Sequence, residues 1–399
     1  MRKPVPSTAT AELLTRAVTE VVPRELADAK LALGKPLRVY FGIDPTGAKL
    51  HLGHAVPLRK LCAFQQAGHH VILVIGSFTA MIGDPSGRDT TRESLTEQQV
   101  KKNFATYKKQ AALVLDFGKV ELRYNHEWLG KLKSKELVEL ASHFTVQQLL
   151  ERDMFRERQR KLQPIGMHEL LYPLMVGYDS VVLDVDVELG GNDQLFNMLC
   201  GRTLQRQYGK RDKFVLTTKL LEGTDGRKMS KTYDNCIYLT DTPAEMFGKL
   251  MSINDNLITT YMECCTDIST ADIAAVTKAL AAGANPKPHK EHLAKEIVTL
   301  YHGTAAATKA ASEFNQVHRE HKQPTNMPTI KIPAGKKSMP ITDLLVYAKL
   351  APSKAQARRL VEQGGVKVGG EIVKDWQANV GLKSGLVLQV GSRKFAKLL

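Results

Sequence analysis

The sequence predicts an α/β fold built on a Rossmann-like, doubly wound parallel sheet, and two apolar runs near the N-terminus carry this prediction. Residues 36–44 contain Leu-Arg-Val-Tyr-Phe-Gly-Ile, typical of a buried strand, and lead into a turn and a helical pattern over residues 50–66. Residues 70–76 are almost wholly apolar, as a central parallel strand covered on both faces should be. Strands that alternate with helices favour an open, mostly parallel sheet.

Two further segments complete the first expected domain, residues 1–235. A third apolar run at 180–189 ends in two glycines and is interpreted as another strand. Residues 101–168, between the second and third strands, are charged and helix-periodic. We therefore expect a helical insertion that lies on the sheet rather than in it.

The rest of the chain predicts an α-helical domain and a small α+β domain. Residues 242–316 are rich in Ala, Glu, Lys and Leu, which favours helices over a domain at 236–321. A stretch rich in Pro and Lys marks a linker at 322–338, and the C-terminal domain covers 339–399. Its expected helices lie at 341–348 and 353–362, and its expected strands at 366–368 and 386–390.

The composition is that of a globular protein with a basic surplus. Of the 399 residues, 43% are hydrophobic and 24% charged, which argues against a disordered or fibrous chain. The net charge is +15, and residues 331–399 alone hold 13 basic and 4 acidic side chains. The surplus favours a polyanionic partner such as nucleic acid or a nucleotide; solubility is the alternative reason, and the concentration of charge in the tail favours the partner.

Cysteine usage and apolar patterning favour a cytoplasmic protein. The five cysteines are an odd number without a CxxC pair, so they predict neither a disulfide framework nor a zinc site. The N-terminus has no secretory apolar run, and the longest apolar stretch, 71–82, is short of the roughly 20 residues that a membrane span needs. We expect no membrane association.

Two short motifs predict a phosphate site. His-Leu-Gly-His at 51–54 stands where the first helix begins, so both imidazoles share one face beside the free N–H groups and the positive end of the helix dipole. Lys-Met-Ser-Lys-Thr at 228–232 lies in a polar loop and carries two ammonium groups. Alone, such a loop is usually a solvated turn, and two histidines can be unrelated. Neither a Walker-type loop nor GxGxxG occurs, so another device must hold phosphates.

Together the two motifs resemble the paired signatures of class I aminoacyl-tRNA synthetases. Four further motifs stand in the order found in the bacterial tyrosyl-tRNA synthetases, and this resemblance covers essentially the whole chain. They are Tyr-Phe-Gly-Ile-Asp-Pro-Thr at 40–46, Gly-Asp-Pro-Ser-Gly-Arg at 83–88, Tyr-Pro-Leu-Met-Val-Gly-Tyr-Asp at 172–179 and Gly-Gly-Asn-Asp-Gln at 190–194. The resemblance implies a tyrosine–tRNA ligase, which forms tyrosyl-adenylate and pyrophosphate from tyrosine and ATP and then transfers tyrosyl to the 3′ end of tRNA(Tyr).

Carried onto this sequence, the resemblance assigns a role to each motif residue. Tyr40 and Asp179 would bind the phenolic hydroxyl of tyrosine, while Asp84 and Tyr172 would hold its ammonium group. Asp193 would bind the ATP ribose. The implied tyrosine site comprises Tyr40, Asp84, Tyr172, Val176, Asp179 and Gln194. The implied ATP site comprises Gly42, Asp44, His51, Gly53, His54, Asp193, Lys228, Met229 and Lys231. The implied catalytic groups at the phosphates are Thr46, His51, His54, Lys228 and Lys231, with Arg88 and Arg92 as further candidates.

The implied first step needs no Ser, Cys or general base, because a carboxylate is already a nucleophile. The protein then has only to position the reactants and stabilise charge on the phosphates, with Mg²⁺ carried by ATP. One position departs from the family, which usually has Gln where this chain has Val176. The loss of that amide would remove a hydrogen bond worth about 1 kcal/mol.

The tail resembles an RNA-binding module first described in a ribosomal small-subunit protein. Its basic helix carries Lys354, Arg358 and Arg359, which would bind tRNA phosphates without reading sequence. The family resemblance also implies a homodimer that uses the 101–168 insertion.

Two alternatives remain open. An RNA-binding or splicing protein that kept the synthetase scaffold without its chemistry is favoured only by Val176, whereas the two intact signature motifs favour the enzyme. The class signatures alone would also permit a tryptophanyl-tRNA synthetase, against which the tail argues.

Overall fold

The computed structural model describes residues 12–86, 95–319, 327–333, 335, 337–391 and 394–399. The chain forms two compact units. The first contains residues 1–241 and 249–301, and the second contains 242–248 and 302–399.

The core of the first unit is a six-stranded sheet in the order β1-β6-β5-β2-β3-β4. Strands β2 to β6 are parallel, and β1 pairs with β6 in the antiparallel sense. After β2 the chain builds outward through β3 and β4, then returns to the other side of β2 with β5 and β6. The winding direction therefore reverses between β2 and β5, where open α/β sheets hold their ligands. The strands are β1 (Val18–Val22), β2 (Arg38–Ile43), β3 (His70–Ile75), β4 (Val120–Tyr124), β5 (Val187–Gly191) and β6 (Phe214–Thr218).

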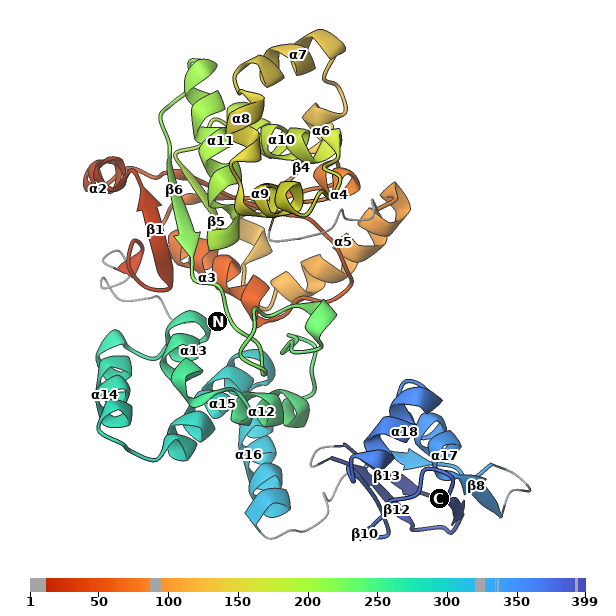
Figure 1. Cartoon of the computed structure of the whole chain (residues 1–399). Helices are drawn as coiled ribbons and strands as arrows, with labels where there is room; N and C mark the ends of the chain where they lie inside the picture. Colours follow the sequence, from red (N-terminus) through yellow and green to blue (C-terminus); the bar gives the residue numbers. More distant parts are fainter. Residues whose placement is uncertain (1–11, 87–94, 320–326, 334, 336, 392–393) are drawn as a thin grey trace. The chain divides into compact units, whose positions relative to one another are not determined.

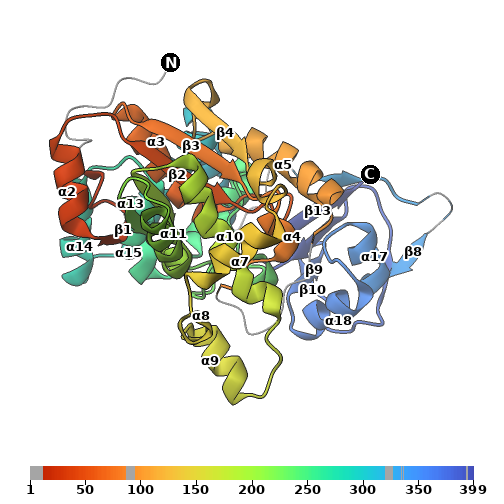
Figure 2. The same ribbon diagram turned by 90° about the horizontal axis from the view of Figure 1, so that it is seen from above.

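Helices cover both faces of this sheet, which confirms the doubly wound fold. Helices α3 (Leu52–Gln66) and α5 (Glu97–Ala111) lie on one face, and α10 (Met167–Leu183) and α11 (Leu195–Gln207) on the other (Figure 1). Figure 2 shows α2 (Arg24–Ala32) beside β1 at one end of the unit and α5 beside β4 at the other. Apolar side chains of β2 and β3 pack with α10 in a buried cluster that includes Tyr40.

Two expectations about strands were wrong. Strand β4 lies within the expected helical insertion, yet it is hydrogen-bonded to β3 from Val71↔Val120 to Ile75↔Tyr124. Its side chains are all half-buried at the sheet edge, which explains why its sequence is not apolar enough to predict a strand. The run 180–189 is divided, because α10 continues to Leu183 and ends at Asp184 in a left-handed conformation before β5 begins. The helices of the insertion are α6 (His126–Leu129), α7 (Ser134–Ser142), α8 (Val146–Leu150) and α9 (Asp153–Arg160).

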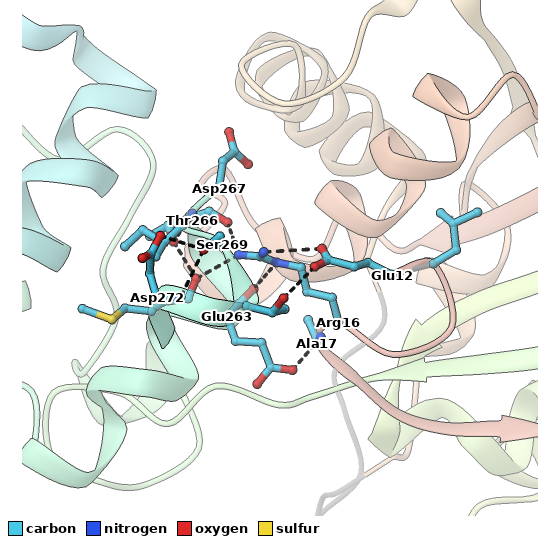
Figure 3. Close-up of polar contacts among 12 residues, drawn as sticks. Glu12, Arg16, Ala17, Glu263, Thr266, Asp267, Ser269 and Asp272 are labelled. Atoms are coloured by element: carbon cyan, nitrogen blue, oxygen red, sulfur yellow. Dashed lines mark hydrogen bonds and ion pairs between the residues drawn. The ribbon is translucent and has the colours of Figure 1, made fainter. Parts of the chain in front are cut away.

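The segment from 242 to 316 is helical, as predicted. It contains α12 (Pro243–Met251), α13 (Ile258–Cys265), α14 (Thr270–Ala281), α15 (Pro286–His302) and α16 (Thr304–Arg319). Its division at residue 236 from the first expected domain stays a prediction. The N-terminal segment anchors α13: Arg16 donates to the carbonyl oxygens of Glu263 and Thr266 at 3.1 and 2.9 Å, and the Glu263 carboxylate accepts the N–H of Ala17 at 2.8 Å (Figure 3).

The tail of the second unit forms a small α+β structure. A five-stranded sheet, β10-β9-β12-β13-β7, and a two-stranded sheet, β11-β8, accompany helices α17 (Ile341–Tyr347) and α18 (Lys354–Glu362). The predicted helices and both predicted strands, at 366–368 and 386–390, are confirmed. The segment expected as a linker contains β7 and the start of β8, and residues 320–326 lie outside the described part. The tail strands are β7 (Thr329–Ile330), β8 (Ser338–Pro340), β9 (Val366–Val368), β10 (Glu371–Ile372), β11 (Asn379–Gly381), β12 (Val387–Val390) and β13 (Lys394–Leu398).

Candidate active site

A cleft of about 290 Å³ lies at the carboxyl ends of β2 and β5, where the winding direction reverses. Fifteen of the sixteen residues predicted for the tyrosine, ATP and catalytic sites line it, and Lys231 is the exception. They are Tyr40, Gly42, Asp44, Thr46, His51, Gly53, His54, Asp84, Tyr172, Val176, Asp179, Asp193, Gln194, Lys228 and Met229. The further candidates Arg88 and Arg92 lie outside the described residues.

A buried phenol–carboxylate pair forms one end of the cleft. Tyr40 on β2 donates its hydroxyl hydrogen to Oδ2 of Asp179 on α10 at 3.3 Å. Asp179 also accepts hydrogen bonds from Trp128 Nε1 at 2.7 Å and from Asn125 Nδ2 at 3.3 Å. Burial raises the pKa of Tyr40 well above its usual value, and it raises the pKa of Asp179 to about 8 although the bonds from Trp128 and Asn125 oppose this shift. The pair therefore offers a hydroxyl and a carboxyl group to one ligand oxygen.

The sequence did not reveal Trp128 and Asn125 as site residues. Both follow β4, the strand that the sequence did not predict. Asn125 also donates to Thr79 Oγ1 at 3.0 Å, and Thr79 donates to Asp44 Oδ1 at 2.7 Å, so one polar chain connects the two ends of the cleft.

Two carboxylates, Asp44 and Asp84, give the other end of the cleft a negative character. Tyr172, which was expected to hold the ammonium group together with Asp84, donates its hydroxyl hydrogen to Asp44 Oδ2 at 3.0 Å. Asp84 accepts a hydrogen bond from Gln194 Nε2 at 2.9 Å. Such an arrangement suits an ammonium ligand.

The two motif histidines are neutral hydrogen-bond donors at the start of α3. The backbone N–H of His51 donates to Nδ1 of His54 at 3.3 Å, which leaves the proton of the neutral His54 ring on Nε2. Burial lowers the pKa of His51 to about 2 and that of His54 to about 3, and Lys228 and Lys231 reinforce both shifts. The ring centroids are 3.8 Å apart. Gly53 stands between them in the sequence, and a Cβ there would meet His51 Nδ1 at 3.0 Å, so a larger residue would press on this ring.

The lysine loop lies against the cleft. Lys228 Nζ donates to Asp193 Oδ2 at 2.8 Å, and the Lys231 ammonium group approaches Gly47 so closely that it occupies the space of a Cβ. Buried Asn235, which the sequence did not reveal, accepts the N–H of Ser230 at 2.8 Å and so anchors the loop. Both ammonium groups are thus near the imidazoles, although Lys231 does not line the cleft.

A buried ion pair beneath Tyr40 was also missed by the sequence. Glu188 on β5 stands beside Tyr40 in the sheet register, and Lys213 donates to its carboxylate and to Ser180. Burial raises the pKa of Glu188 and lowers that of Lys213, while their mutual attraction opposes both shifts. Gly201 is required here, because a Cβ would come within 2.7 Å of Lys213 Nζ.

The three predicted RNA-binding residues lie on α18 in the second unit. Lys354 pairs with Asp343 at 2.6 Å, and Arg358 pairs with Glu362 at 2.7 Å while its guanidinium lies 4.3 Å from the Trp376 ring centroid. Arg359 is exposed. The helix begins at a Ser353 cap, whose hydroxyl accepts the N–H of Gln356.

Within the described ranges, no three His, Cys, Asp or Glu side chains are grouped so that they could hold a metal ion. No helix of this part of the chain is both long and apolar enough to cross a bilayer.

A doubly wound sheet whose reversal point carries a histidine pair and a lysine loop defines a class I aminoacyl-tRNA synthetase. Residues 32–319 match the family of class I tRNA synthetases for tryptophan and tyrosine. Residues 320–389 match the C-terminal domain of SYY-like tyrosine–tRNA ligases. The tyrosine–tRNA ligase of Moorella thermoacetica is 47% identical over 392 residues, 97% of this chain and 94% of the relative, and that of Thermotoga maritima is 46% identical over 97% of this chain and 96% of the relative. The chain belongs to the tyrosine–tRNA ligases.

Solved structures agree with this fold. A truncated mitochondrial tyrosyl-tRNA synthetase from Aspergillus nidulans has a TM-score of 0.65 at 23% identity, covering 78% of this chain and 94% of that chain. The Archaeoglobus fulgidus tyrosyl-tRNA synthetase, complexed with L-tyrosine, has a TM-score of 0.61 at 22% identity, covering 76% and 99%. At these identities the likeness concerns the fold alone.

Proposed function

We propose that the protein activates tyrosine with ATP to form tyrosyl-adenylate and then transfers the tyrosyl group to tRNA(Tyr). The observation that carries this proposal is the buried Tyr40–Asp179 pair at 3.3 Å. A phenylalanine ring would leave both polar groups without a ligand partner inside an apolar environment, and sites of this kind can reject such an analogue by about 10⁵-fold. The tyrosine hydroxyl therefore inserts between these two groups.

The opposite end of the cleft receives the amino acid backbone. We assign the ammonium group to Asp84, with Tyr172 and Gln194 beside it. Val176 lines the cleft but offers no hydrogen bond. This site therefore binds tyrosine more weakly, by about 1 kcal/mol, than a site that has glutamine at position 176.

Activation joins a carboxylate oxygen of tyrosine to the α-phosphorus of ATP as the bond to pyrophosphate breaks. Neutral His51 and His54 donate hydrogen bonds to phosphate oxygens, and Lys228 and Lys231 supply positive charge. Thr46, at the turn after β2, adds a hydroxyl on the same side. These groups accelerate the step to the extent that they bind the transition state more tightly than they bind ATP.

The loop must rearrange when ATP binds, because the Lys228 ammonium group is hydrogen-bonded to Asp193, the carboxylate that we assign to the ribose. The ribose hydroxyls then replace the ammonium group, which becomes free to reach phosphate. Gly42, Asp44 and Met229 border the same space. The exchange ties loop movement to occupation of the nucleotide site.

Magnesium accompanies ATP in this proposal. The ion would be held by phosphate oxygens and water rather than by a protein cage. Mg²⁺ would neutralise charge on the phosphates.

The remaining proposals concern partners and location. The basic helix α18 binds the tRNA backbone, and the protein acts in the cytoplasm.

A homodimer uses the insertion, where Val138, Leu162 and Met167 are 68, 94 and 69% exposed, an unusual set of apolar side chains for a free surface. Analytical ultracentrifugation of the wild type and of Leu162→Asp would test the dimer.

Exchange of labelled pyrophosphate into ATP, run separately with each amino acid, tests the activity. We expect exchange with tyrosine alone, and a lower tyrosine KM for Val176→Gln. Exchange driven by tryptophan would contradict the specificity. Exchange that appears only in Val176→Gln would instead support an RNA-binding protein that has lost the chemistry.

A further inference from the structure

Arg152 is a buried cation that the insertion places behind the wall of the cleft. It precedes α9, and only 8% of its surface is exposed. Its guanidinium lies 4.9 Å from the ring centroid of Phe196 and 5.8 Å from that of Phe155. Burial lowers its pKa, and the charge of Asp84 opposes this shift. Among the described residues no ion pair joins it to a carboxylate. A buried charge without such a pair costs stability, so packing alone does not explain an arginine at this position.

The hydrogen bonds of Arg152 lead to the amino acid site. Its Nη2 donates to Ser86 Oγ at 2.6 Å, and the backbone N–H of Ser86 donates to Asp84 Oδ1 at 2.9 Å. Asn197 Nδ2 donates to the same Ser86 hydroxyl at 3.3 Å and to Gln194 Oε1 at 2.7 Å. Gln194 closes the ring through its bond to Asp84 Oδ2. Both oxygens of the Asp84 carboxylate are therefore fixed by one closed network.

The Ser86 hydroxyl is the junction of this network. It has two acceptor lone pairs, and the donors from Arg152 and Asn197 engage both. The bond from the charged guanidinium is the shorter and the stronger of the two. Because Ser86 is only 8% exposed, water cannot readily take the place of Arg152. Loss of Arg152 would leave the 84–86 turn free to move.

We propose that Arg152 is a positioning residue for the ammonium group of tyrosine, acting through Ser86 on the carboxylate of Asp84. The proposal rests on the ammonium role proposed for Asp84. Arg152 itself does not line the cleft and touches no substrate.

Two ligands separate this role from a general effect on folding. Tyramine keeps the ammonium group and lacks the carboxylate, whereas 3-(4-hydroxyphenyl)propanoate lacks the ammonium group. For Arg152→Gln we expect the tyrosine KM and the tyramine inhibition constant to rise by about tenfold, as for a lost charge-assisted hydrogen bond. The inhibition constant of the propanoate and the KM for ATP should stay within about twofold of the wild type, because neither contacts Asp84.

Matched variants keep the test decisive. Arg152→Lys retains a charged donor and should recover part of the loss, while exposed Arg156→Ala on α9, the helix that follows Arg152, should match the wild type. Ser86→Ala removes the junction without removing a charge and should weaken tyramine selectively, so it replaces Arg152→Gln if that variant does not fold.

The outcomes distinguish this inference from the proposed function. Equal weakening of tyramine and of the propanoate in Arg152→Gln would overturn the positioning role. So would a ratio of their two inhibition constants that stays unchanged in Ser86→Ala. Asp84→Asn is measured in parallel, since equal weakening of both ligands there would overturn the ammonium role of Asp84 itself.

Discussion

Nζ of Lys228 lies 2.8 Å from Oδ2 of Asp193, so a cation of the lysine loop neutralises a carboxylate that lines the cleft. The pair is partly exposed, and pairs of this kind contribute little to stability, about 1 kcal/mol or less. It can therefore open when a ligand offers hydroxyl groups to Asp193. In the function proposed above, the entry of the ribose opens this pair and so connects the lysine loop to one particular step.

The Asp193→Ala variant tests this connection. We expect the KM for ATP to rise by about tenfold, because the variant loses the acceptor for the ribose hydroxyls, while the KM for tyrosine changes little. Pyrophosphate exchange at varied ATP concentration measures the change. The control is Asp234→Asn, which removes a carboxylate from the same loop. Asp234 has a left-handed φ of 51°, which asparagine tolerates. An unchanged KM for ATP in Asp193→Ala would assign the ribose to another group.

The Tyr40→Phe variant tests the phenol pocket. We expect the ratio of kcat/KM for tyrosine to kcat/KM for phenylalanine to fall by about tenfold or more. A phenylalanine ring leaves two polar groups of the pocket without a ligand partner, and the variant removes one of them. The fold should survive, since the ring remains in the apolar cluster of β2, β3 and α10. Competitive pyrophosphate exchange with both amino acids gives the ratio. A ratio equal to that of the wild type would place the tyrosine hydroxyl away from Tyr40.

His51 makes stability depend on pH. Its pKa falls from 6.5 in the unfolded chain to about 2 in the fold because of burial, so the neutral ring stabilises the fold above pH 6.5. As the pH falls below 6.5, the unfolded state binds a proton that the native state does not, and this contribution is progressively lost.

His51→Asn, which keeps a residue suited to the N-cap of α3, removes this contribution. Between pH 6.5 and 4.5, we expect the free energy of unfolding of the wild type to fall by about 2 kcal/mol more than that of the variant. Urea titrations at several pH values measure it. Parallel curves for the two proteins would show that His51 carries its proton equally in both states.

The sequence predicted the parts of the site that stand in contiguous motifs, and it missed the parts that only the sheet brings together. The strand 70–76 and the histidine helix are strongly patterned, so periodicity sufficed for both. Strand β4 is short and half-buried, and without it Asn125 and Trp128 cannot be placed on Asp179. Likewise, the pairing of Tyr172 with Asp44 depends on the angle between α10 and β2, which no local pattern encodes.

The buried pair of Lys213 and Glu188 belongs to this second group and yields the last prediction. Lys213 has no exposed surface, and its ammonium group contacts Glu188 and Ser180 beneath Tyr40. Removal of one partner leaves an uncompensated charge in the interior, which costs about 3–5 kcal/mol. We therefore expect Lys213→Met to lower the free energy of unfolding by this amount, measured by urea titration at pH 7. The double variant Lys213→Met/Glu188→Leu should recover most of the loss, because a pair replaced by apolar side chains of similar volume is often neutral. If the double variant were as unstable as the single one, the loss would come from packing around Gly201 rather than from the isolated carboxylate.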